Sequence, residues 1–98
     1  MNQAIISAIQ DKQVLSIWYN GGARLIEPHC YGLSNAGNEL LRCYQISGHS
    51  VSGQHEGWKL MTVEGIQNIN PSGDTFIGPR PHYNPISDKH IPTVYAKI

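Results

Sequence analysis

Residues 24–47 constrain the fold more than any other part of the chain, because they read as one β-hairpin. Both arms alternate apolar and polar residues, and Asn35–Asn38 between them supplies residues that tolerate the positive φ of a tight turn. A two-residue turn or a four-residue loop at this point predicts the pairs Tyr31 with Arg42, His29 with Tyr44 and Cys30 with Cys43. A loop one residue longer shifts this pairing, and the alternation then survives only with a bulge.

The alternation gives the two faces of this hairpin different chemistry. One face is expected to carry the polar and aromatic residues His29, Tyr31, Arg42 and Tyr44. The other face is expected to carry the small apolar residues Ile26, Pro28, Cys30, Leu41 and Cys43. An aromatic and cationic cluster backed by small apolar groups predicts a binding surface rather than a reaction centre.

The remaining segments predict a small, mostly β fold with a helix first. Residues 2–11 carry apolar side chains at helical spacing after a candidate N-cap, Asn2. Residues 14–19 are β-branched and aromatic, and Asn20-Gly21-Gly22 after them is a hairpin signal. Polar, glycine-rich residues at 48–57 predict an exposed loop. The further predicted elements are a strand at 58–61, a strand at 63–69 bent at Gly65, and a turn at 70–74.

We therefore expect a single domain over residues 1–98, with an N-terminal helix at 2–11 and a strongly bent antiparallel β-barrel at 13–70. Residues 71–98 are rich in proline and predict an extended wrap across the barrel, held by Tyr83, Ile86 and Ile91 and ending in a last strand or a short helix.

Composition narrows the function classes. The chain has 98 residues, a formal net charge of zero and 14% charged residues, so any anion must bind through a local cluster of cations. The N-terminus lacks the pattern of a signal peptide, and no apolar run approaches the ~20 residues of a membrane span, which favours a cytoplasmic protein. The pair of cysteines, Cys30 and Cys43, is expected to be buried and reduced, although their predicted opposition would allow a bridge under oxidising conditions.

The order of several short motifs resembles the WYL domain, a module with an Sm-like or SH3-like β-barrel. The residues that carry this resemblance are Ala8-Ile9, Val14–Tyr19, Arg24–His29, Tyr31-Gly32, Glu39–Tyr44 and Gly57–Ile66. The resemblance implies a ligand-sensing module of the kind attached to bacterial transcription regulators, here as a stand-alone unit, with nucleotides or single-stranded nucleic acid as ligands. Where the family strand has basic residues, this chain has Thr62 and Gly65, with Lys59 nearby.

The expected ligand site combines cations with aromatic rings. Arg42 offers a planar fork of donors for phosphate, with Arg24 and Lys59 in support. Stacking against the flat part of a ligand is expected from Tyr31, Tyr44 and His29. The alternative for Arg42 is an ion pair with Glu27 or Glu39.

Other chemistry finds little support in the sequence. Neighbours in a strand point to opposite faces, so His29 and Cys30 share a site only if the chain bulges, and no zinc-ligand spacing is present. No catalytic residue, metal or cofactor is predicted, because the acids are scattered and nucleophile or phosphate-loop motifs are missing. The sequence predicts a non-enzymatic module that binds an anionic ligand, with a protein-interaction or homodimerisation module as the alternative.

Overall fold

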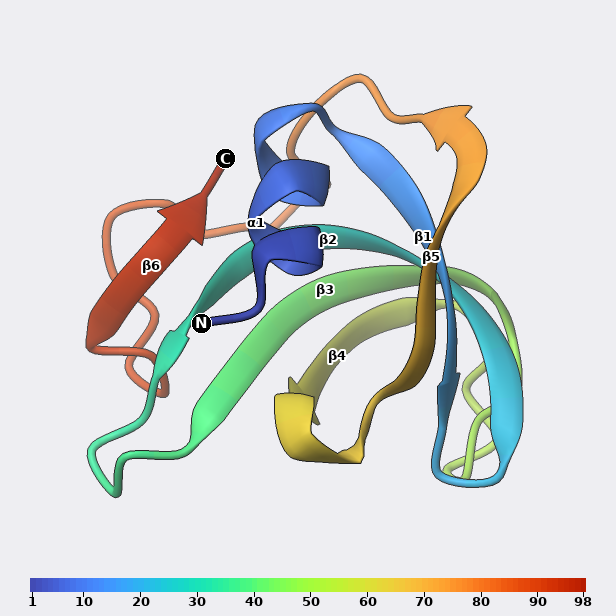
Figure 1. Ribbon diagram of the computed structural model, residues 1–98, viewed down its shortest axis with the longest axis horizontal. Coiled ribbons are helices and arrows are strands. Elements are labelled where there is room, and N and C mark those ends of the chain that lie inside the picture. The colour runs from blue at the N-terminus through green and yellow to red at the C-terminus, as the bar shows by residue number, and fades with distance from the viewer.

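The computed structural model describes residues 1–98 and contains one α-helix and one antiparallel sheet of six strands (Figure 1). The elements in chain order are α1 (Gln3–Gln10), β1 (Gln13–Tyr19), β2 (Gly22–Leu33), β3 (Glu39–Gly48), β4 (Gly57–Thr62), the 3₁₀ turn η1 (Val63–Gly65), β5 (Gln67–Thr75) and β6 (Thr93–Lys97). This confirms a mostly β chain with a short N-terminal helix. None of its helices has the length and apolar character to cross a bilayer.

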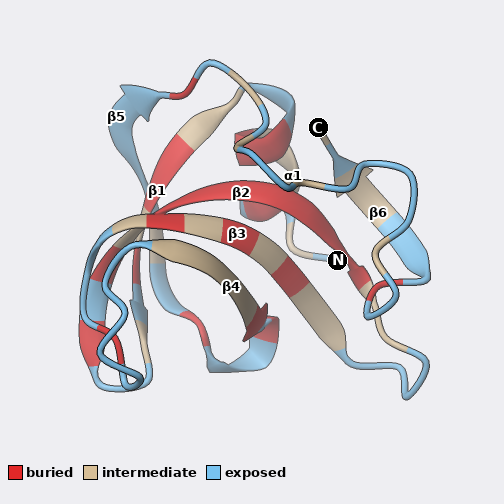
Figure 2. Ribbon diagram, turned by 180° about the vertical axis from the view of Figure 1, so that it is seen from behind, coloured by how far each residue is buried: buried red, intermediate tan, exposed pale blue.

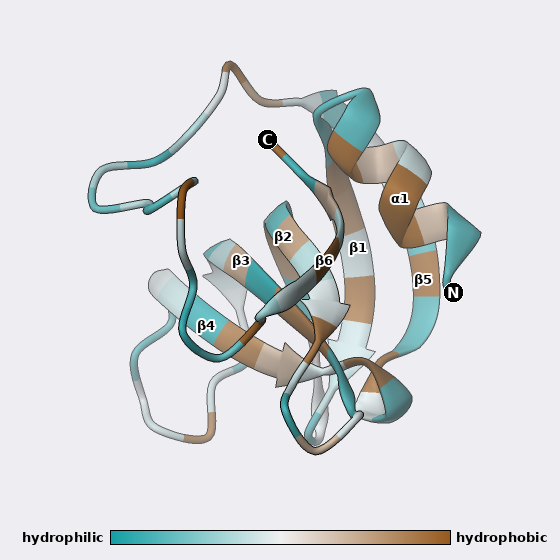
Figure 3. Cartoon of the chain, turned by 90° about the vertical axis from the view of Figure 1, so that its left-hand side faces the viewer, coloured by the Kyte–Doolittle hydropathy of each residue, from teal (hydrophilic) through white to brown (hydrophobic).

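The helix α1 is fixed at its start and along one face. The side chain of Asn2 accepts a hydrogen bond from the backbone N–H of Ile5, which confirms the predicted N-cap. Ile5, Ala8 and Ile9 are buried, and the helix lies against β1, β2 and β6. These side chains join the apolar residues of the sheet in one core, whose hydrophobic bands are visible in Figure 3.

The sheet is built around β2, whose 12 residues pair with three other strands. One edge of β2 pairs with β3, while the other edge pairs first with β1 and then with β6. Figure 2 shows that β2 is buried along most of its length, as expected for a strand with neighbours on both sides.

The sheet does not close into the expected barrel. The strand order β4-β3-β2-β1-β5 leaves β4 and β5 at the two ends, and neither pairs with the other. The register between β1 and β5 is irregular, and Pro71 in β5 has no N–H to donate to a ladder. The structure is therefore a strongly curved open sheet.

The predicted register of the central hairpin is wrong. The loop is Ser34–Asn38, one residue longer than a four-residue loop, so Tyr31 pairs with Leu41 and Cys30 pairs with Arg42. A second shift follows between Pro28 and Cys30, where the chain bulges at His29.

This register redistributes the predicted faces. Tyr31 joins the core cluster with Ile26, Leu41 and Cys43 instead of lying beside Arg42. Cys30 and Cys43 do not face each other, which removes the basis for a bridge between them. Both cysteines are buried free thiols, as expected.

The second half of the chain differs from the expectation in three places. Residues 70–74, expected to form a turn, belong to β5, and residues 63–65, expected in a strand, form η1. The C-terminal residues form a strand, β6, rather than a helix. Residues 76–92, here called the strap, contain no helix or strand and arch from β5 to β6 beside β2, β3 and β4 (Figure 3).

The strap is held at fewer points than predicted. Ile91 is buried and Tyr83 is half-buried, whereas the side chain of Ile86 is exposed and anchors nothing. Polar contacts replace this missing apolar anchor, as described below.

Candidate ligand-binding site

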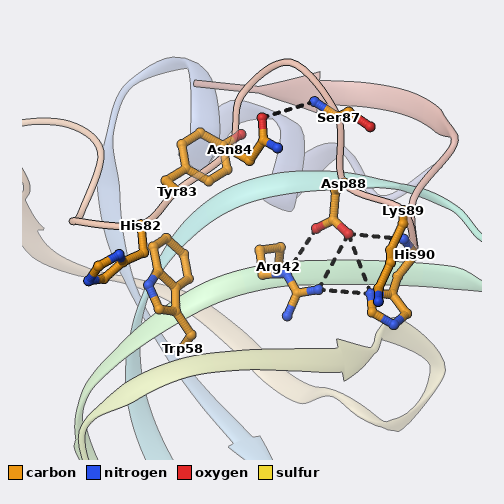
Figure 4. A pocket seen from close by; sticks show the side chains of 9 residues that line it. All are labelled: Arg42, Trp58, His82, Tyr83, Asn84, Ser87, Asp88, Lys89 and His90. Carbon is orange, nitrogen blue, oxygen red and sulfur yellow. Dashed lines mark hydrogen bonds and ion pairs between the residues drawn. The ribbon is translucent and has the colours of Figure 1, made fainter.

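A pocket of about 280 Å³ lies between the sheet and the strap (Figure 4). The sheet contributes Arg42 from β3 and Trp58 from β4. The strap contributes the rest of the lining: His82, Tyr83, Asn84, Ser87, Asp88, Lys89 and His90. This volume lies at the lower end of the range for ligand pockets, so the Arg42 pocket suits a small molecule or one unit of a larger one.

Arg42 is held by the strap at one side of this pocket. Its Nε donates to Asp88 Oδ2 at 2.9 Å, and its Nη2 lies 3.4 Å from Asp88 Oδ1 and 3.2 Å from His90 Nδ1. Nη1 has no hydrogen-bond partner and extends away from these two groups in Figure 4. The expected alternative, a pair with Glu27 or Glu39, is wrong, because the acid that Arg42 meets lies in the strap.

The carboxylate of Asp88 is stabilised in its charged form. Burial alone would raise the pKa of Asp88, but hydrogen bonds from Arg42 and from the backbone N–H of His90 outweigh it and hold this pKa below its usual value. Asp88 therefore stays ionised at neutral pH and fixes the guanidinium of Arg42 in place.

Aromatic side chains form a second wall of the pocket. The rings of Trp58 and Tyr83 are stacked, with centroids 5.8 Å apart and planes 23° apart. Tyr44 lies outside the pocket and packs edge-on against Trp58 at 5.6 Å, while its hydroxyl donates to Glu56 and this bond raises the pKa of Tyr44. Tyr44 thus supports the wall rather than contacting the pocket.

His29 lies beneath the strap, outside the Arg42 pocket. Its side chain is fully buried, and its ring stacks on Phe76 with centroids 5.6 Å apart. Nε2 accepts a hydrogen bond from the backbone N–H of Arg80 at 3.2 Å, so Nδ1 carries the proton and donates to the carbonyl of Glu27 at 2.8 Å. Burial lowers the pKa of His29, which keeps the ring neutral.

Arg80 and Glu27 form a second link between strap and sheet that the sequence did not predict. Arg80 Nε and Nη2 donate to the two carboxylate oxygens of Glu27 at 2.7 and 2.9 Å. The guanidinium carbon lies 4.5 Å from the centre of the Tyr44 ring, and the bond to Glu27 raises the pKa of Arg80. The signal in the sequence was a single arginine between Pro79 and Pro81, an unusual place for an isolated charge.

Tyr31 was expected at the site but has a structural role. It is fully buried, its ring packs edge-on against Tyr95, and its hydroxyl donates to Glu39 while accepting from the backbone N–H of Asn2. Burial, together with the bond to Glu39, raises the pKa of Tyr31 to about 12. Tyr31 therefore ties the start of α1 to the sheet.

Arg24 and Lys59 also lie away from the pocket. Arg24 is 5% exposed, donates to the carbonyl of Tyr19 and to Gln45 Oε1, both at 3.2 Å, and has no carboxylate partner. Lys59 Nζ donates to Ser50 Oγ at 3.1 Å and to a backbone carbonyl of the same loop at 2.7 Å. Lys59 therefore holds the loop between β3 and β4, and Arg24 links the end of β1 to β3. Of the six predicted ligand-binding residues, only Arg42 lines the pocket.

The cysteines offer no reactive or metal-binding group to the site. Burial raises the pKa of Cys30, and it raises that of Cys43 to about 12. The bulge at His29 brings His29 and Cys30 to the strap together, contrary to their expected separation, since Tyr83 contacts both residues. No group of three or more His, Cys, Asp or Glu side chains is arranged to hold a metal ion.

Comparisons with protein-family models, with curated proteins and with solved structures found no match. The resemblance to the WYL domain therefore stays a prediction from the residue pattern. A functional assignment rests on the geometry of the pocket itself.

Proposed function

We propose that this protein is a non-enzymatic module that binds a small anionic ligand with a flat ring, such as a nucleotide or the end of a single-stranded nucleic acid. The observation that carries this proposal is that Arg42, whose Nη1 has no hydrogen-bond partner, lines the same pocket as the stacked rings of Trp58 and Tyr83. A guanidinium donates to phosphate oxygens, and an indole or phenol ring stacks on a base.

The charge and size of the pocket agree with such a ligand. Its lining holds the cations Arg42 and Lys89 against the single anion Asp88, which gives a formal net charge of +1 when only Lys, Arg, Asp and Glu are counted. Its volume of about 280 Å³ favours one nucleotide unit over a longer stretch of nucleic acid. The ligand in this proposal binds beside Asp88 and leaves the Arg42–Asp88 pair intact.

The wider assignment is part of the same proposal. An N-terminal helix followed by five consecutive antiparallel strands supports an Sm-like class and, with it, the resemblance to the WYL domain. A regulatory role in a bacterium follows from that resemblance. A cytoplasmic location and a proline-rich wrap across the sheet follow from the residue pattern instead, and all of these stay proposals.

Fluorescence anisotropy of a labelled nucleoside monophosphate and of labelled single-stranded oligonucleotides tests the proposal. Binding should weaken as salt rises from low to moderate ionic strength, since part of it is electrostatic. Arg42→Ala removes a charged hydrogen-bond donor worth roughly 1.5–3 kcal/mol, so we expect affinity to fall by about tenfold or more.

A matched control removes one positive charge elsewhere. Lys12 lies outside the pocket in the turn between α1 and β1 and has a φ of 51°, which asparagine tolerates. Lys12→Asn should leave the affinity unchanged. Equal loss in Lys12→Asn and Arg42→Ala, or no binding of either probe at low salt, would contradict the proposal.

The alternative function, a protein-interaction or homodimerisation module, is favoured by one observation. Strands β4 and β5 each have a free edge, and eight of the nine residues of β5 are exposed (Figure 2). Exposed edges accept strands from other chains. Light scattering across a range of protein concentrations distinguishes this function, because edge pairing between copies predicts a mass that rises with concentration.

A further inference from the structure

The residues Arg80–Tyr83 form a tight turn in the strap. The backbone N–H of Tyr83 donates to the carbonyl of Arg80 at 3.2 Å, which places Pro81 and His82 at the two central positions. His82 has a φ of 73°, so the turn combines proline at the first central position with positive φ at the second, as a type II turn does. That second position favours glycine or asparagine, and histidine is less favourable there than glycine because its Cβ approaches the following carbonyl oxygen.

The sheet contacts the other three residues of this turn, Arg80, Pro81 and Tyr83. We call the receiving side chains, Glu27, His29, Tyr44 and Trp58, the cradle. Glu27 and Tyr44 enclose the guanidinium of Arg80, as described above, and Trp58 Nε1 donates to the carbonyl of Pro81 at 2.9 Å. Tyr83 packs edge-on against the ring of His29 with centroids 5.0 Å apart, and its hydroxyl donates to the His29 carbonyl at 3.1 Å.

The side chains of the cradle favour an occupant with particular chemical groups. The side chain of Glu27 is 6% exposed, and a carboxylate this buried needs a cation with matching donors. The indole N–H of Trp58 needs an acceptor, and a carbonyl that follows proline in a turn is presented outward. The preferred occupant is therefore a turn of sequence Arg-Pro-x-Tyr.

The strap occupies the cradle through the contacts of this turn. It has no strand pairing of its own, and its strained His82 weakens the turn that it presents. Just before this turn, Ile77 is fully exposed, and an open depression of about 550 Å³ lies beside Glu27 and Arg80. Solvent thus reaches Arg80 from this side, where its side chain is 37% exposed.

We propose that the cradle is a recognition site for an Arg-Pro-Gly-Tyr turn of a partner protein, and that the chain's own strap is its resident competitor. Glycine in place of histidine relieves the strain at the second central position, so a partner turn is better suited to the site than the strap. The proposal does not require an anion to bind, but the two sites overlap, because Trp58 belongs to both and Tyr83 of the strap lines the Arg42 pocket. Glu27 and Tyr44 lie outside that pocket, so Glu27→Gln tests the cradle alone.

The test uses the full chain and a labelled peptide that copies residues 78–85 with glycine at the position of His82. Arg80→Ala in the full chain weakens the binding of its own strap to the cradle and changes none of the cradle's side chains. We expect the peptide to bind this variant at least tenfold more tightly than the parent, whose tethered turn competes at an effective concentration in the millimolar range. A peptide that keeps histidine should bind about five- to thirtyfold more weakly than the glycine peptide.

Two controls tie the binding to the cradle. A peptide with alanine in place of arginine should lose at least tenfold in affinity, and Glu27→Gln added to the Arg80→Ala chain should do the same. Should the Arg80→Ala chain fail to fold, excess peptide added to the parent should still shift the NMR signal of the Trp58 indole N–H.

Three results would overturn the proposal. One is peptide binding that does not saturate at millimolar concentration on either chain. Another is equal binding of the arginine and alanine peptides. The last is a dimer of the parent chain that Arg80→Ala abolishes, since the occupant would then be the strap of a second copy.

Discussion

The two partners of the Glu27–Arg80 ion pair are expected to differ in how much the protein is destabilised when each is removed. The side chain of Glu27 is 6% exposed, whereas that of Arg80 is 37% exposed. Arg80→Ala leaves a buried carboxylate without its cation, while Glu27→Ala leaves a guanidinium that water can reach. We therefore predict that Arg80→Ala is the more destabilising of the two substitutions.

The magnitude follows from the two hydrogen bonds of 2.7 and 2.9 Å. Hydrogen bonds to charged groups contribute roughly 1.5–3 kcal/mol, and the exposure of Arg80 places this pair near the lower end. Arg80→Ala should cost about 2 kcal/mol and lower Tm by roughly 8–16 °C in a domain of this size. Glu27→Ala should cost about 1 kcal/mol.

Urea denaturation of the parent, both single variants and the double variant measures this interaction as a double-mutant cycle. We expect a coupling free energy of about 1–2 kcal/mol. A coupling free energy below about 0.5 kcal/mol is typical of an exposed surface pair. Such a value would show that burial of Glu27 does not strengthen its interaction with Arg80.

Three further predictions concern other parts of the fold. Burial lowers the pKa of His29 below its unfolded value of 6.5, so the unfolded chain binds a proton at a higher pH than the folded chain does. The free energy of unfolding should therefore fall as pH drops below about 6.5, by at most about 1.4 kcal/mol per pH unit. Urea denaturation at several pH values should show a weaker dependence of this free energy on pH in His29→Asn. Gly32→Ala places a Cβ 1.9 Å from the carbonyl oxygen of Thr93 and should detach β6, seen as faster amide exchange there, whereas Gly78→Ala meets nothing within 4 Å and should be neutral. The Cys43 thiol, fully buried and with its pKa raised to about 12, should resist iodoacetamide at pH 8 in the folded chain and react in urea; rapid labelling without urea would contradict this.

Local signals in the sequence were sufficient to predict most elements. The N-cap at Asn2 and the turn at Asn20-Gly21, where both residues have positive φ, are set by the chemistry of a few adjacent residues. Side-chain alternation then placed β1, β2 and β3 within two residues of their observed bounds. Such features depend on neighbours in the chain, which the sequence displays directly.

The register of the central hairpin was predicted wrongly because one additional residue in the loop is enough to change it. One additional residue in the loop Ser34–Asn38 and a bulge at His29 moved Tyr31 into the core and separated it from Arg42. With a side-chain period of two, any such shift exchanges the faces of a strand. Neither the loop length nor the bulge has a distinctive residue that predicts it.

The strap contacts were missed because they join distant parts of the chain. Arg42 and Asp88 are 46 positions apart, and Glu27 and Arg80 are 53 apart. No periodicity links residues at such separations, and a segment without regular structure gives no face on which to place its side chains. The sequence predicted Arg42 as a ligand residue, and Arg42 lines a pocket, but the sequence did not predict the strap that completes this pocket.

An NMR titration with a nucleoside monophosphate tests whether the Arg42 pocket binds an anionic ligand, because the chain has one indole at this pocket and one outside it. Trp58 lines the Arg42 pocket, whereas Trp18 lies on β1 and is 43% exposed. We expect saturable shifts of the Trp58 indole N–H and the Arg42 Nε–H, an unshifted Trp18, and weaker binding of the nucleoside without phosphate. Equal shifts of both indoles, or no shift of Trp58 at millimolar ligand, would contradict it.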